Sequence, residues 1–393
     1  MKILIITNEN YKSNSAYSRR LDFYIKIFSY LKYEITIICT GYLNKNELNY
    51  EIKTIRYSEP ISGYYKNIKN LFMAKKKILR IYQKYLYNEK YDFVFLGGGY
   101  TRLFLPAKKI SLICSGKLII DVCEWFSVWQ FPFAFMDPTF IDNRYAMRKL
   151  YKKSCGIFVI SDYMYNYYTK KEKGFKVMQI PPLCNCNEDY TSFEEINSSL
   201  ILPNSENLKI KIIYAGFFGK SKDYIKHNIL KLSEYPDICS KVEFHLCGSS
   251  MKIKKRNIDK YNYIVQHGMV DSETVKKYIK ESDYSIIIRK NNINSKAGFS
   301  TKIVESMEMG VPIICNLFGD LHKYLFHKKN AYILSGYRFH DFLEGIKEIA
   351  NLNSDLYLQM KKQAYITAKD YFNYYNYVDS IKSFLYYIKR ENI

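Results

Sequence analysis

The stretch Lys296-Ala297-Gly298-Phe299-Ser300-Thr301-Lys302-Ile303-Val304-Glu305 is the part of the sequence from which we infer both a fold and a site. It follows a strand-like run, Tyr284 to Arg289, and opens a helix that ends near Gly310, before a second strand-like run begins at Val311. A strand, a small-residue loop and a helix in this order form the repeating unit of a parallel α/β sheet. The free N–H groups and the dipole at the start of the helix make the loop an anion site.

Two charged side chains of this stretch indicate what such a site would bind. Lys302 and Glu305 are three residues apart, so they lie on neighbouring faces of the helix. A cation beside the loop and a carboxylate one turn later suit a ligand with both phosphate groups and sugar hydroxyls. The same spacing also fits a surface lysine and a solvated glutamate, so the spacing alone leaves both interpretations open.

The size and charge of the chain restrict the remaining choices. With 393 residues it is longer than one ordinary hydrophobic core supports, so we expect two domains. The hydrophobic fraction of 48%, with 25% charged residues, is typical of a soluble globular protein. The formal net charge of +22 favours negatively charged partners, namely nucleotide substrates, nucleic acid or an anionic membrane surface.

Cysteine spacing and hydropathy argue against several classes of protein. The nine cysteines are scattered, and the only close pair, Cys184 and Cys186, lacks metal-ligand spacing. The apolar run at the N-terminus stops at Thr7, too early for a signal peptide, and no run reaches the roughly 18 apolar residues of a membrane span. We therefore expect a cytoplasmic protein, with peripheral attachment to the inner face of the plasma membrane left open.

Strand-like and helical segments alternate in both halves of the chain. The first half opens with a strand at Lys2–Ile6, a helix from Arg19 and a strand at Glu34–Cys39, without the Gly-x-Gly-x-x-Gly of dinucleotide-binding oxidoreductases. The polar stretch 185–207 is the best linker, and the alternation restarts with a strand at Lys209–Ala215. Two doubly wound α/β domains that face a cleft follow from this repetition.

Residues 66–90 are predicted to form a long basic helix. Its lysines and Arg80 alternate with apolar residues, which is typical of a helix that packs on a sheet and exposes a solvated basic face. The same face would also suit docking on anionic lipid, where each cation near the surface contributes about 1 kcal/mol.

Four short patterns follow one another in the second half of the chain. They are Gly216 with Lys220 and Lys222, Cys247-Gly248, His267-Gly268-Met269-Val270, and Gly298 to Glu305 with its continuation Met309 to Ile314. In this order they resemble the donor domain of retaining glycosyltransferases of the GT-B fold, of the family 4 type that builds bacterial surface polysaccharides. The resemblance is strongest over residues 209–335, and only the last pattern is specific by itself.

The resemblance implies an α/β GT-B architecture of two Rossmann-like domains and a sugar transfer. Its expected parts are an acceptor-binding domain, a linker, a nucleotide-sugar-binding domain and a helix that crosses back, at residues 1–190, 191–207, 208–370 and 371–393. The donor would be a nucleotide-diphosphate sugar and the acceptor a glycan or a lipid-linked sugar, with retention at the anomeric carbon. No cofactor, no bound metal and no nucleic-acid partner are expected.

The resemblance also implies roles for residues of the donor side. Glu305 would accept hydrogen bonds from the ribose hydroxyls. Lys222 would neutralise the diphosphate as charge develops on the leaving oxygen, helped by Arg289 or Lys302. The other donor-binding residues would be Gly216, Lys220, Gly248, Gly268, Val270, Ser300 and Thr301.

Two positions depart from the family pattern. The family places a carboxylate eight residues before Glu305, where this chain has Ala297, so the contacts to the donor sugar are not predicted. Relatives often place a histidine at the acceptor-side strand end, where this chain has Cys123. Asp121 or Glu124 would instead meet the acceptor hydroxyl as catalytic residues, or either would be a structural cap.

Other classes of function stay open beside the transferase. The charge of +22 also fits a non-catalytic protein that binds nucleic acid or an anionic surface, although no nucleic-acid motif is recognisable. A sugar epimerase or a phosphorylase of the same fold would need acid/base or cofactor residues that the sequence does not reveal. The histidines read as isolated structural or surface residues: His227, His245, His322, His327 and His340.

Overall fold

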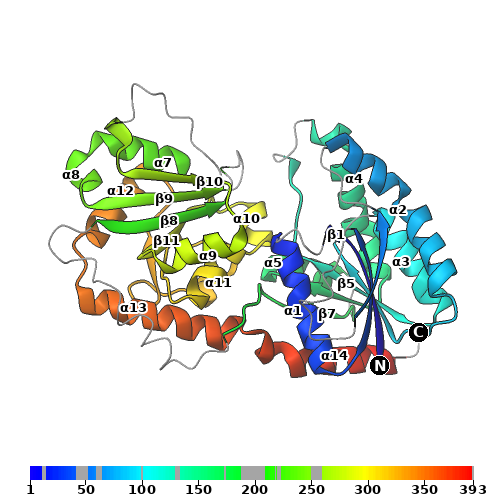
Figure 1. Cartoon of the computed structure of the whole chain (residues 1–393). Helices are drawn as coiled ribbons and strands as arrows, with labels where there is room; N and C mark the ends of the chain where they lie inside the picture. The colour runs from blue at the N-terminus through cyan, green and yellow to red at the C-terminus, as the bar shows by residue number, and fades with distance from the viewer. Residues whose placement is uncertain are drawn as a thin grey trace. The chain divides into compact units, whose positions relative to one another are not determined.

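The structure is a computed structural model, and it describes residues 1–10, 15–40, 52–58, 64–98, 101–128, 133–171, 174–186, 209–216, 218, 223–248 and 259–391. It divides into two compact units (Figure 1). Unit 1 holds Met1–Leu183, Ala297–Phe299 and Tyr374–Ile393, and unit 2 holds Cys184–Lys296 and Ser300–Asn373. The C-terminal segment of the chain therefore belongs to the same unit as the N-terminal half.

Unit 1 is built on a seven-stranded sheet in the order β3-β2-β1-β4-β5-β6-β7. All neighbouring strands pair in parallel. The strands are β1 (Lys2–Asn10), β2 (Glu34–Thr40), β3 (Ile52–Ser58), β4 (Phe93–Gly97), β5 (Lys117–Val122), β6 (Gly156–Val159) and β7 (Val177–Gln179). The strand order reverses between β1 and β4, and ligands of open α/β sheets bind at the carboxyl ends of the strands at such a reversal.

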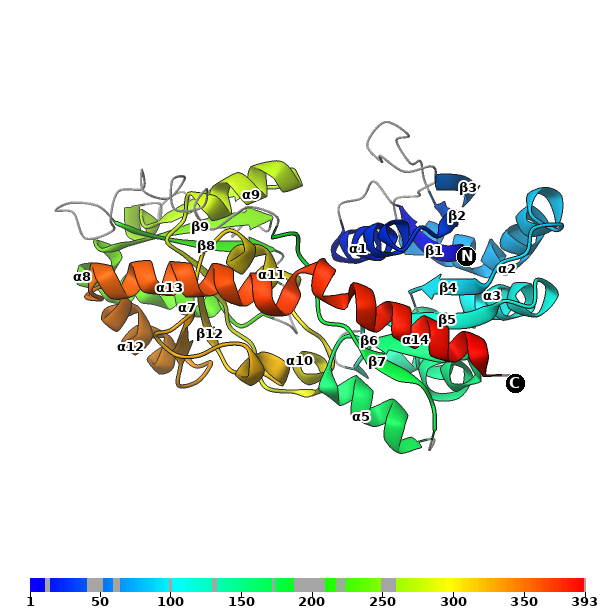
Figure 2. The same cartoon turned by 90° about the horizontal axis from the view of Figure 1, so that it is seen from below.

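Helices cover both faces of this sheet, so its strands are apolar on both sides. One core cluster joins Leu4 and Ile6 to helices α2 (Tyr64–Tyr85), α3 (Thr101–Ile113) and α5 (Asp162–Lys171), and to the π-helical turn that follows α4 (Pro138–Tyr145). The other joins Ile3 and Ile5 to α1 (Ala16–Tyr30) and α14 (Val378–Arg390). Helix α14 runs below the unit 1 strands in Figure 1 and in front of them in Figure 2.

Two helical segments of unit 1 differ from what the sequence predicted. Helix α3 was not predicted; Pro106 stands inside it, and proline disfavours a helix interior. The pattern of Asp142–Lys153 predicts one continuous helix, but the structure has the end of α4, a π-helical turn at Ala146–Leu150 and a 3₁₀ turn at Tyr151–Lys153.

Unit 2 is built on a six-stranded sheet in the order β10-β9-β8-β11-β12-β13. Its strands are β8 (Ile210–Gly216), β9 (Val242–Gly248), β10 (Ile264–Gly268), β11 (Tyr284–Ile287), β12 (Ile313–Asn316) and β13 (Ala331–Leu334), and all pair in parallel. The strand order reverses between β8 and β11. A ligand site of unit 2 is therefore expected where β8 and β11 end.

The helices of unit 2 also lie on both faces of the sheet. Helices α7 (Lys226–Lys231), α12 (Phe339–Ile349) and α13 (Ser354–Thr367) share a core cluster with Ile212 and Phe244. Ile279 of α9 (Ser272–Lys280) packs on the other face with Ile213 and Cys247. The remaining helices are α8 (Pro236–Cys239), α10 (Ile293–Ala297) and α11 (Thr301–Glu308).

The two parallel sheets confirm the predicted pair of doubly wound α/β domains. Strand β13 has the predicted bounds, and β8 is displaced by one residue. The predicted linker 191–207 lies outside the described residues. In the part of the chain that the structure describes, no helix is long and apolar enough to cross a bilayer.

Candidate functional site

Three neighbouring strands of unit 2 end in glycine at one edge of the sheet: Gly216 of β8, Gly248 of β9 and Gly268 of β10. Gly248 has a φ of +102°, and a Cβ there would lie 2.9 Å from the carbonyl oxygen of Gly216. Only glycine fits both the backbone conformation and the close approach. The strand ends can therefore lie close together beside the reversal between β8 and β11.

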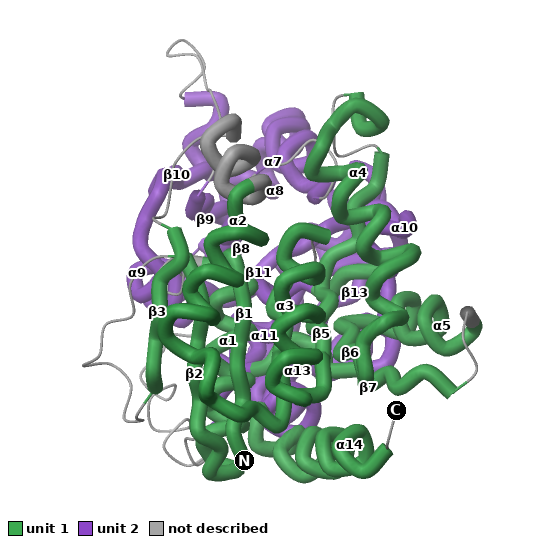
Figure 3. Tube along the Cα trace, turned by 90° about the vertical axis from the view of Figure 1, so that its right-hand side faces the viewer, with its two compact units in different colours: residues 1–183, 297–299, 374–393 green, residues 184–296, 300–373 purple. Residues whose placement is uncertain are grey.

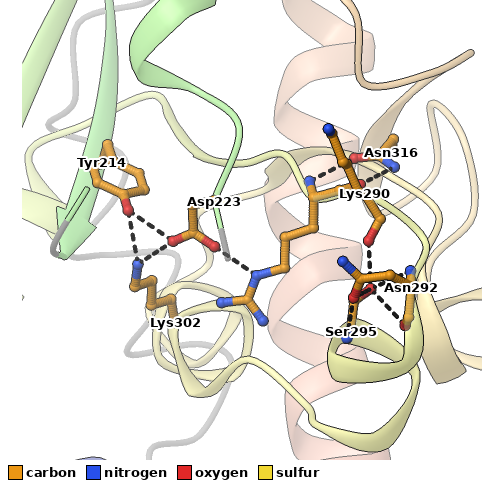
Figure 4. Close-up of polar contacts among 8 residues, drawn as sticks. Tyr214, Asp223, Lys290, Asn292, Ser295, Lys302 and Asn316 are labelled. Atoms are coloured by element: carbon orange, nitrogen blue, oxygen red, sulfur yellow. Dashed lines mark hydrogen bonds and ion pairs between the residues drawn. The ribbon is translucent and has the colours of Figure 1, made fainter. Parts of the chain in front are cut away.

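Asp223 stands at the centre of a charged cluster at this edge (Figure 4). Its side chain is 3% exposed and receives Arg289 Nε–H on Oδ1 at 2.6 Å and Lys302 Nζ on Oδ2 at 2.9 Å. The Tyr214 hydroxyl donates to the same Oδ2 at 2.7 Å. One carboxylate thus joins a residue of β8, the second residue after β11 and the first turn of α11.

The cluster contains more positive than negative charge. Burial by itself would raise the pKa of Asp223, but Arg289, Lys302 and the hydrogen bond from Tyr214 outweigh it and hold that pKa well below its usual range. Burial lowers the pKa of Lys302, and Asp223 counteracts this effect. Two cations that share one ionised carboxylate leave a surplus positive charge, which suits an anionic ligand.

Gly216 makes room for the lysine of this cluster. A Cβ at this position would overlap Lys302 Nζ and lie 2.6 Å from Lys302 Cε. The ammonium group also lies over the Tyr214 ring, 4.4 Å from its centroid. The glycine that ends β8 is therefore required for the path of the lysine, in addition to any direct contact with a ligand.

Asn316, the last residue of β12, fixes the backbone of Arg289. The N–H of Arg289 donates to Asn316 Oδ1 at 3.0 Å, and Asn316 Nδ2 donates back to the carbonyl oxygen of Arg289 at 2.8 Å (Figure 4). The Arg289 guanidinium also lies 5.4 Å from the Phe318 ring centroid. These contacts hold the arginine at the point where the sheet reverses its strand order.

The other residues predicted for the donor side are distributed around this cluster. Ser300 is 5% exposed and is the N-cap residue of α11, with Thr301 the first residue of the helix. Glu305 is half-buried one turn later, and its charge raises the pKa of Lys302. The roles predicted for Lys220 and Lys222 stay predictions, because both residues lie outside the described residues.

The loop after β10 exposes Met269 more than Val270, the residue that the sequence predicted to bind the donor. Val270 is partly buried and packs against the cluster that contains Ile213, Cys247 and Ile279. The preceding Met269 is 71% exposed. A ligand at this loop would therefore reach Met269 and the backbone of Gly268 more easily than the side chain of Val270.

The interpretation of His245 as an isolated residue is wrong. His245 Nδ1 lies 3.0 Å from His267 Nε2, and its Nε2 lies 2.8 Å from Glu243 Oε1. The His267 ring stacks on Tyr278 at 4.0 Å, and burial together with His245 lowers the pKa of His267. The sequence did not reveal this chain of contacts because β9 and β10 become neighbours only in the sheet.

In unit 1, Asp121 is completely buried in an ion pair with Arg20, which is itself 4% exposed. Arg20 Nε and Nη2 donate to both oxygens of Asp121 at 2.9–3.2 Å, and the Tyr24 hydroxyl donates to Oδ1 at 2.7 Å. Arg20 also donates to the carbonyl oxygens of Ile180 and Pro181. This geometry favours the structural alternative for Asp121, because the buried carboxylate offers no face to a substrate hydroxyl.

Glu124 is exposed near the carboxyl end of β5, and Glu9 of β1 is a neighbour that the sequence did not single out. Burial raises the pKa of Glu9, and the negative charge of Glu124 raises it further. The hydrogen bond that Ser15 Oγ donates to Glu9 at 2.8 Å lowers this pKa in part. Two carboxylates thus lie near the reversal between β1 and β4. Burial also raises the pKa of Cys123, which keeps this residue a neutral thiol.

Ala297, which stands where the resembling family has a carboxylate, is fully buried in the core cluster of unit 1. Its carbonyl oxygen accepts a hydrogen bond of 2.8 Å from Ser161 Oγ. A carboxylate at this position would be buried among apolar side chains, which is costly without a partner. The site therefore has no acidic contact from this position.

Among the residues that the structure describes, no three His, Cys, Asp or Glu side chains are placed to hold a metal ion. The cations around Asp223 are the groups that this edge of the sheet offers to an anion. Metal independence, which the sequence led us to expect, stays a prediction.

A family described as "Glycosyl transferases group 1" matches residues 209–351, which contain the glycine edge and the Asp223 cluster. No sequence relative among curated proteins matches the chain. The matched residues lie in unit 2 except for Ala297–Phe299, and they include the four short patterns by which the sequence resembles the donor domain of GT-B glycosyltransferases.

Solved structures resemble the whole chain at low sequence identity. A sucrose-phosphate synthase from Thermosynechococcus elongatus is 13% identical, with 98% of each chain covered and a TM-score of 0.70. Anabaena HepE in complex with UDP-glucose is 13% identical, with 98% of this chain and 100% of that chain covered and a TM-score of 0.67. S. aureus TarM in complex with UDP and alpha-GlcNAc-glycerol is 10% identical, with 99% and 100% covered and a TM-score of 0.66.

These comparisons confirm the predicted α/β GT-B fold. The glycosyl transferase domain in unit 2, together with these neighbours, supports a transferase enzyme.

Proposed function

We propose that this protein transfers a sugar from a nucleotide-diphosphate-sugar donor to a glycan or lipid-linked acceptor, with retention at the anomeric carbon. The observation that carries the proposal is the pair of cations, Arg289 and Lys302, held by Asp223 at the strand reversal of unit 2. The pair lies within the glycosyl transferase domain.

The cation pair suits a diphosphate. Arg289 and Lys302 each use only some of their N–H donors on Asp223, because a guanidinium has five such donors and an ammonium has three. The remaining donors can bind phosphate oxygens as charge-assisted hydrogen bonds. Asp223 keeps the two cations from repelling each other before the donor arrives, which preorganises the site.

Glu305 suits the other end of the donor. It lies one turn along α11 from Lys302, so a ligand whose phosphates meet Lys302 can bring ribose hydroxyls to Glu305. A carboxylate accepts from both hydroxyls of a ribose, which adds charge-assisted hydrogen bonds. HepE binds UDP-glucose, and TarM binds UDP, so neighbours of this fold take the class of ligand proposed for this chain.

The proposed reaction breaks the bond between the anomeric carbon and the diphosphate oxygen. The bonding electrons stay on that oxygen, whose developing charge Arg289 and Lys302 stabilise, with Lys222 as a further predicted cation. The acceptor hydroxyl forms the new bond to the anomeric carbon and gives its proton to a basic oxygen at the site. Proton NMR of the product, which reads the anomeric configuration directly, tests retention.

The acceptor is proposed to approach unit 1 near Glu124 and Glu9. Glu124 is exposed, and burial raises the pKa of Glu9, so these two carboxylates are the groups proposed to take the proton of the acceptor hydroxyl. We propose a cytoplasmic enzyme of cell-surface polysaccharide synthesis, attached peripherally to the inner face of the plasma membrane. Mass spectrometry of products from a panel of nucleotide sugars and acceptors tests substrate and pathway together.

Replacing Glu305 with alanine is expected to weaken binding of UDP or GDP by about 10- to 100-fold, because hydrogen bonds to a charged group contribute about 1.5–3 kcal/mol. Titration calorimetry measures the affinity. Glu344→Ala removes an exposed carboxylate from α12 and serves as the control, with affinity unchanged. Undiminished nucleotide affinity in Glu305→Ala would refute the donor site proposed here.

Replacing Gly216 with alanine is expected to lower nucleotide affinity about tenfold. The new Cβ displaces Lys302 from its position beside Asp223, and one charge-assisted hydrogen bond to the diphosphate is lost. The melting temperature should also fall, because Gly216 has a φ of +155°, a backbone conformation that residues with a Cβ rarely adopt. Adding Lys302→Ala to the Gly216→Ala variant should then cause little further loss, whereas additive losses would contradict this account.

A further inference from the structure

One helical layer of unit 1 carries a large excess of positive charge. Helices α2 and α3 and the turns at 146–153 contain Lys and Arg as their only charged residues, with no Asp or Glu. Helix α3 packs beside α2, and α4 continues into the turns at 146–153 on the same face of the sheet (Figure 3). Arg102 of α3 pairs with Asp142 of α4 at 3.9 Å, and the excess of cations on this face points to an extended anionic partner.

An apolar projection adjoins this layer. Phe133, Phe135 and Met136 are 83%, 81% and 79% exposed, so three large apolar side chains out of four consecutive residues face solvent. Exposed apolar groups of this density mark interaction sites in soluble proteins. We call Phe133, Phe135 and Met136 the apolar prong.

The apolar prong is held firmly to the basic layer. Asp137, the next residue, caps α4 by accepting from the N–H groups of Thr139 and Phe140. The rings of Phe135 and Phe140 are in contact, with their centroids 6.5 Å apart. Helix α4 then leads directly to the exposed cations Arg148, Lys149 and Lys153.

Further apolar side chains are exposed on the outer surface of α3. Leu105, Leu112 and Ile113 are 39%, 68% and 41% exposed, and Lys109 is exposed between them. Leu105 and Leu112 are seven residues apart, which places them on one side of the helix. The basic layer therefore carries apolar groups of its own beside its cations.

This combination distinguishes between anionic partners. Single-stranded nucleic acid is bound by cations together with aromatic rings on which bases stack. Phe133 and Phe135 are the two aromatic members of the apolar set named above, and its other members, Met136, Leu105, Leu112 and Ile113, offer no such platform. A second copy of the chain would meet the layer with the same positive charge and be repelled. An anionic bilayer matches both features, because headgroups attract the cations while the interface takes up exposed Phe, Leu and Met.

We propose that the basic layer of α2, α3 and residues 146–153 docks unit 1 on an anionic phospholipid bilayer, with the apolar prong inserted among the acyl chains. The prong supplies the insertion and the cations supply the attraction. This proposal rests on the membrane attachment in the proposed function and assigns it to named residues, and vesicle binding can be measured without any sugar transfer.

The first experiment removes the prong from the full-length chain. Phe133→Ser, Phe135→Ser and Met136→Ser are combined, and binding to vesicles of phosphatidylglycerol and phosphatidylethanolamine is followed by flotation. Binding is expected to fall roughly tenfold or more, because the apolar area that leaves water on insertion is lost. The control combines Phe326→Ser, Leu358→Ser and Tyr371→Ser, which removes exposed apolar groups from unit 2 and should leave binding unchanged.

The second experiment removes charge. Arg148→Gln, Lys149→Gln and Lys153→Gln together are expected to lower vesicle binding about 100-fold, since each cation near the surface contributes about a factor of five. Lys276→Gln, Lys277→Gln and Lys280→Gln on α9 remove the same charge from unit 2 and should have no effect. Wild-type binding should also weaken with salt and disappear on phosphatidylcholine vesicles.

The outcomes separate this proposal from its competitors. Absence of wild-type binding to anionic vesicles, or equal losses in the α9 control, would overturn it. Salt-sensitive binding to RNA with no vesicle binding would assign the layer to nucleic acid, and a dimer that the prong variant dissociates would assign the prong to a second copy. Nucleotide affinity, measured on the same samples, reports the proposed function separately, because none of the substituted residues belongs to the donor site.

Discussion

The Lys302→Met variant is expected to retain about 0.1–1% of the wild-type kcat/KM for sugar transfer, because removing one preorganised group that stabilises the leaving charge costs about 100- to 1000-fold. Methionine preserves most of the length of the side chain and removes only the ammonium group. Arg289 stays at 2.6 Å from Asp223 in this variant, so the carboxylate keeps a cationic partner. The loss should therefore fall on catalysis and donor binding, with little change in the melting temperature.

The control for this variant lies in the same stretch of sequence. Lys296 is exposed on α10, and Lys296→Met removes an equal charge six residues earlier. Donor turnover should be unchanged in Lys296→Met. A Lys302→Met enzyme that keeps more than about a third of kcat/KM, well outside the range expected for such a group, would show that Lys302 does not contact the diphosphate.

Replacing Asp121 with alanine is expected to destabilise unit 1 by about 3–5 kcal/mol, because it leaves the buried Arg20 guanidinium without its counter-charge. Arg20 is 4% exposed and cannot turn to solvent without breaking its hydrogen bonds to Ile180 and Pro181. Calorimetry should show the loss in the melting transition of unit 1, while nucleotide binding to unit 2 persists below that transition.

A double variant separates a structural role of Asp121 from a catalytic one. Arg20→Met combined with Asp121→Leu replaces the ion pair by apolar groups of similar size, which is often neutral or stabilising. This variant should recover most of the lost stability and retain sugar transfer. A stable double variant without activity would instead return Asp121 to the catalytic role that the sequence left open.

Much of the fold could be predicted from the sequence because its signals are local. Strands buried on both faces appear as short apolar runs such as Lys2–Ile6 and Ala331–Leu334, and the helices between them have their own periodicity. Helix α3 was not predicted from the sequence because Pro106 interrupts its helical pattern. In the structure, packing in the surrounding core keeps the segment helical. Packing outweighed local preference there.

The donor side of the candidate site was partly predictable for the same reason. Lys302, Glu305 and Ser300 belong to one strand-loop-helix stretch, so their order along the chain already places them near one helix end. Asp223 was not predicted as a site residue. Its ion pairs join positions 66 and 79 residues apart in the sequence, and no local pattern contains such a pairing.

The absence of long-range pairings from local sequence patterns also explains why the environment of His245 was predicted wrongly and that of Asp121 was left open. His245 meets His267 only because β9 and β10 are adjacent in the sheet, and Asp121 meets Arg20 across 101 positions of the chain. Burial and ion pairing depend on which segments pack together. They decide whether a carboxylate binds a substrate or stabilises a core.

By itself the sequence determined that this protein forms two doubly wound α/β units, because apolar periodicity, strand-ending glycines and helix starts act between near neighbours. It also predicted an anion site at the stretch from Lys296 to Glu305. Only the tertiary structure decided that Asp223 holds Arg289 and Lys302 together, that Asp121 is a buried partner of Arg20, and that the apolar prong lies beside a basic layer. These contacts join charged or exposed groups from segments that are distant in the sequence, so they form only when the chain packs into its tertiary structure.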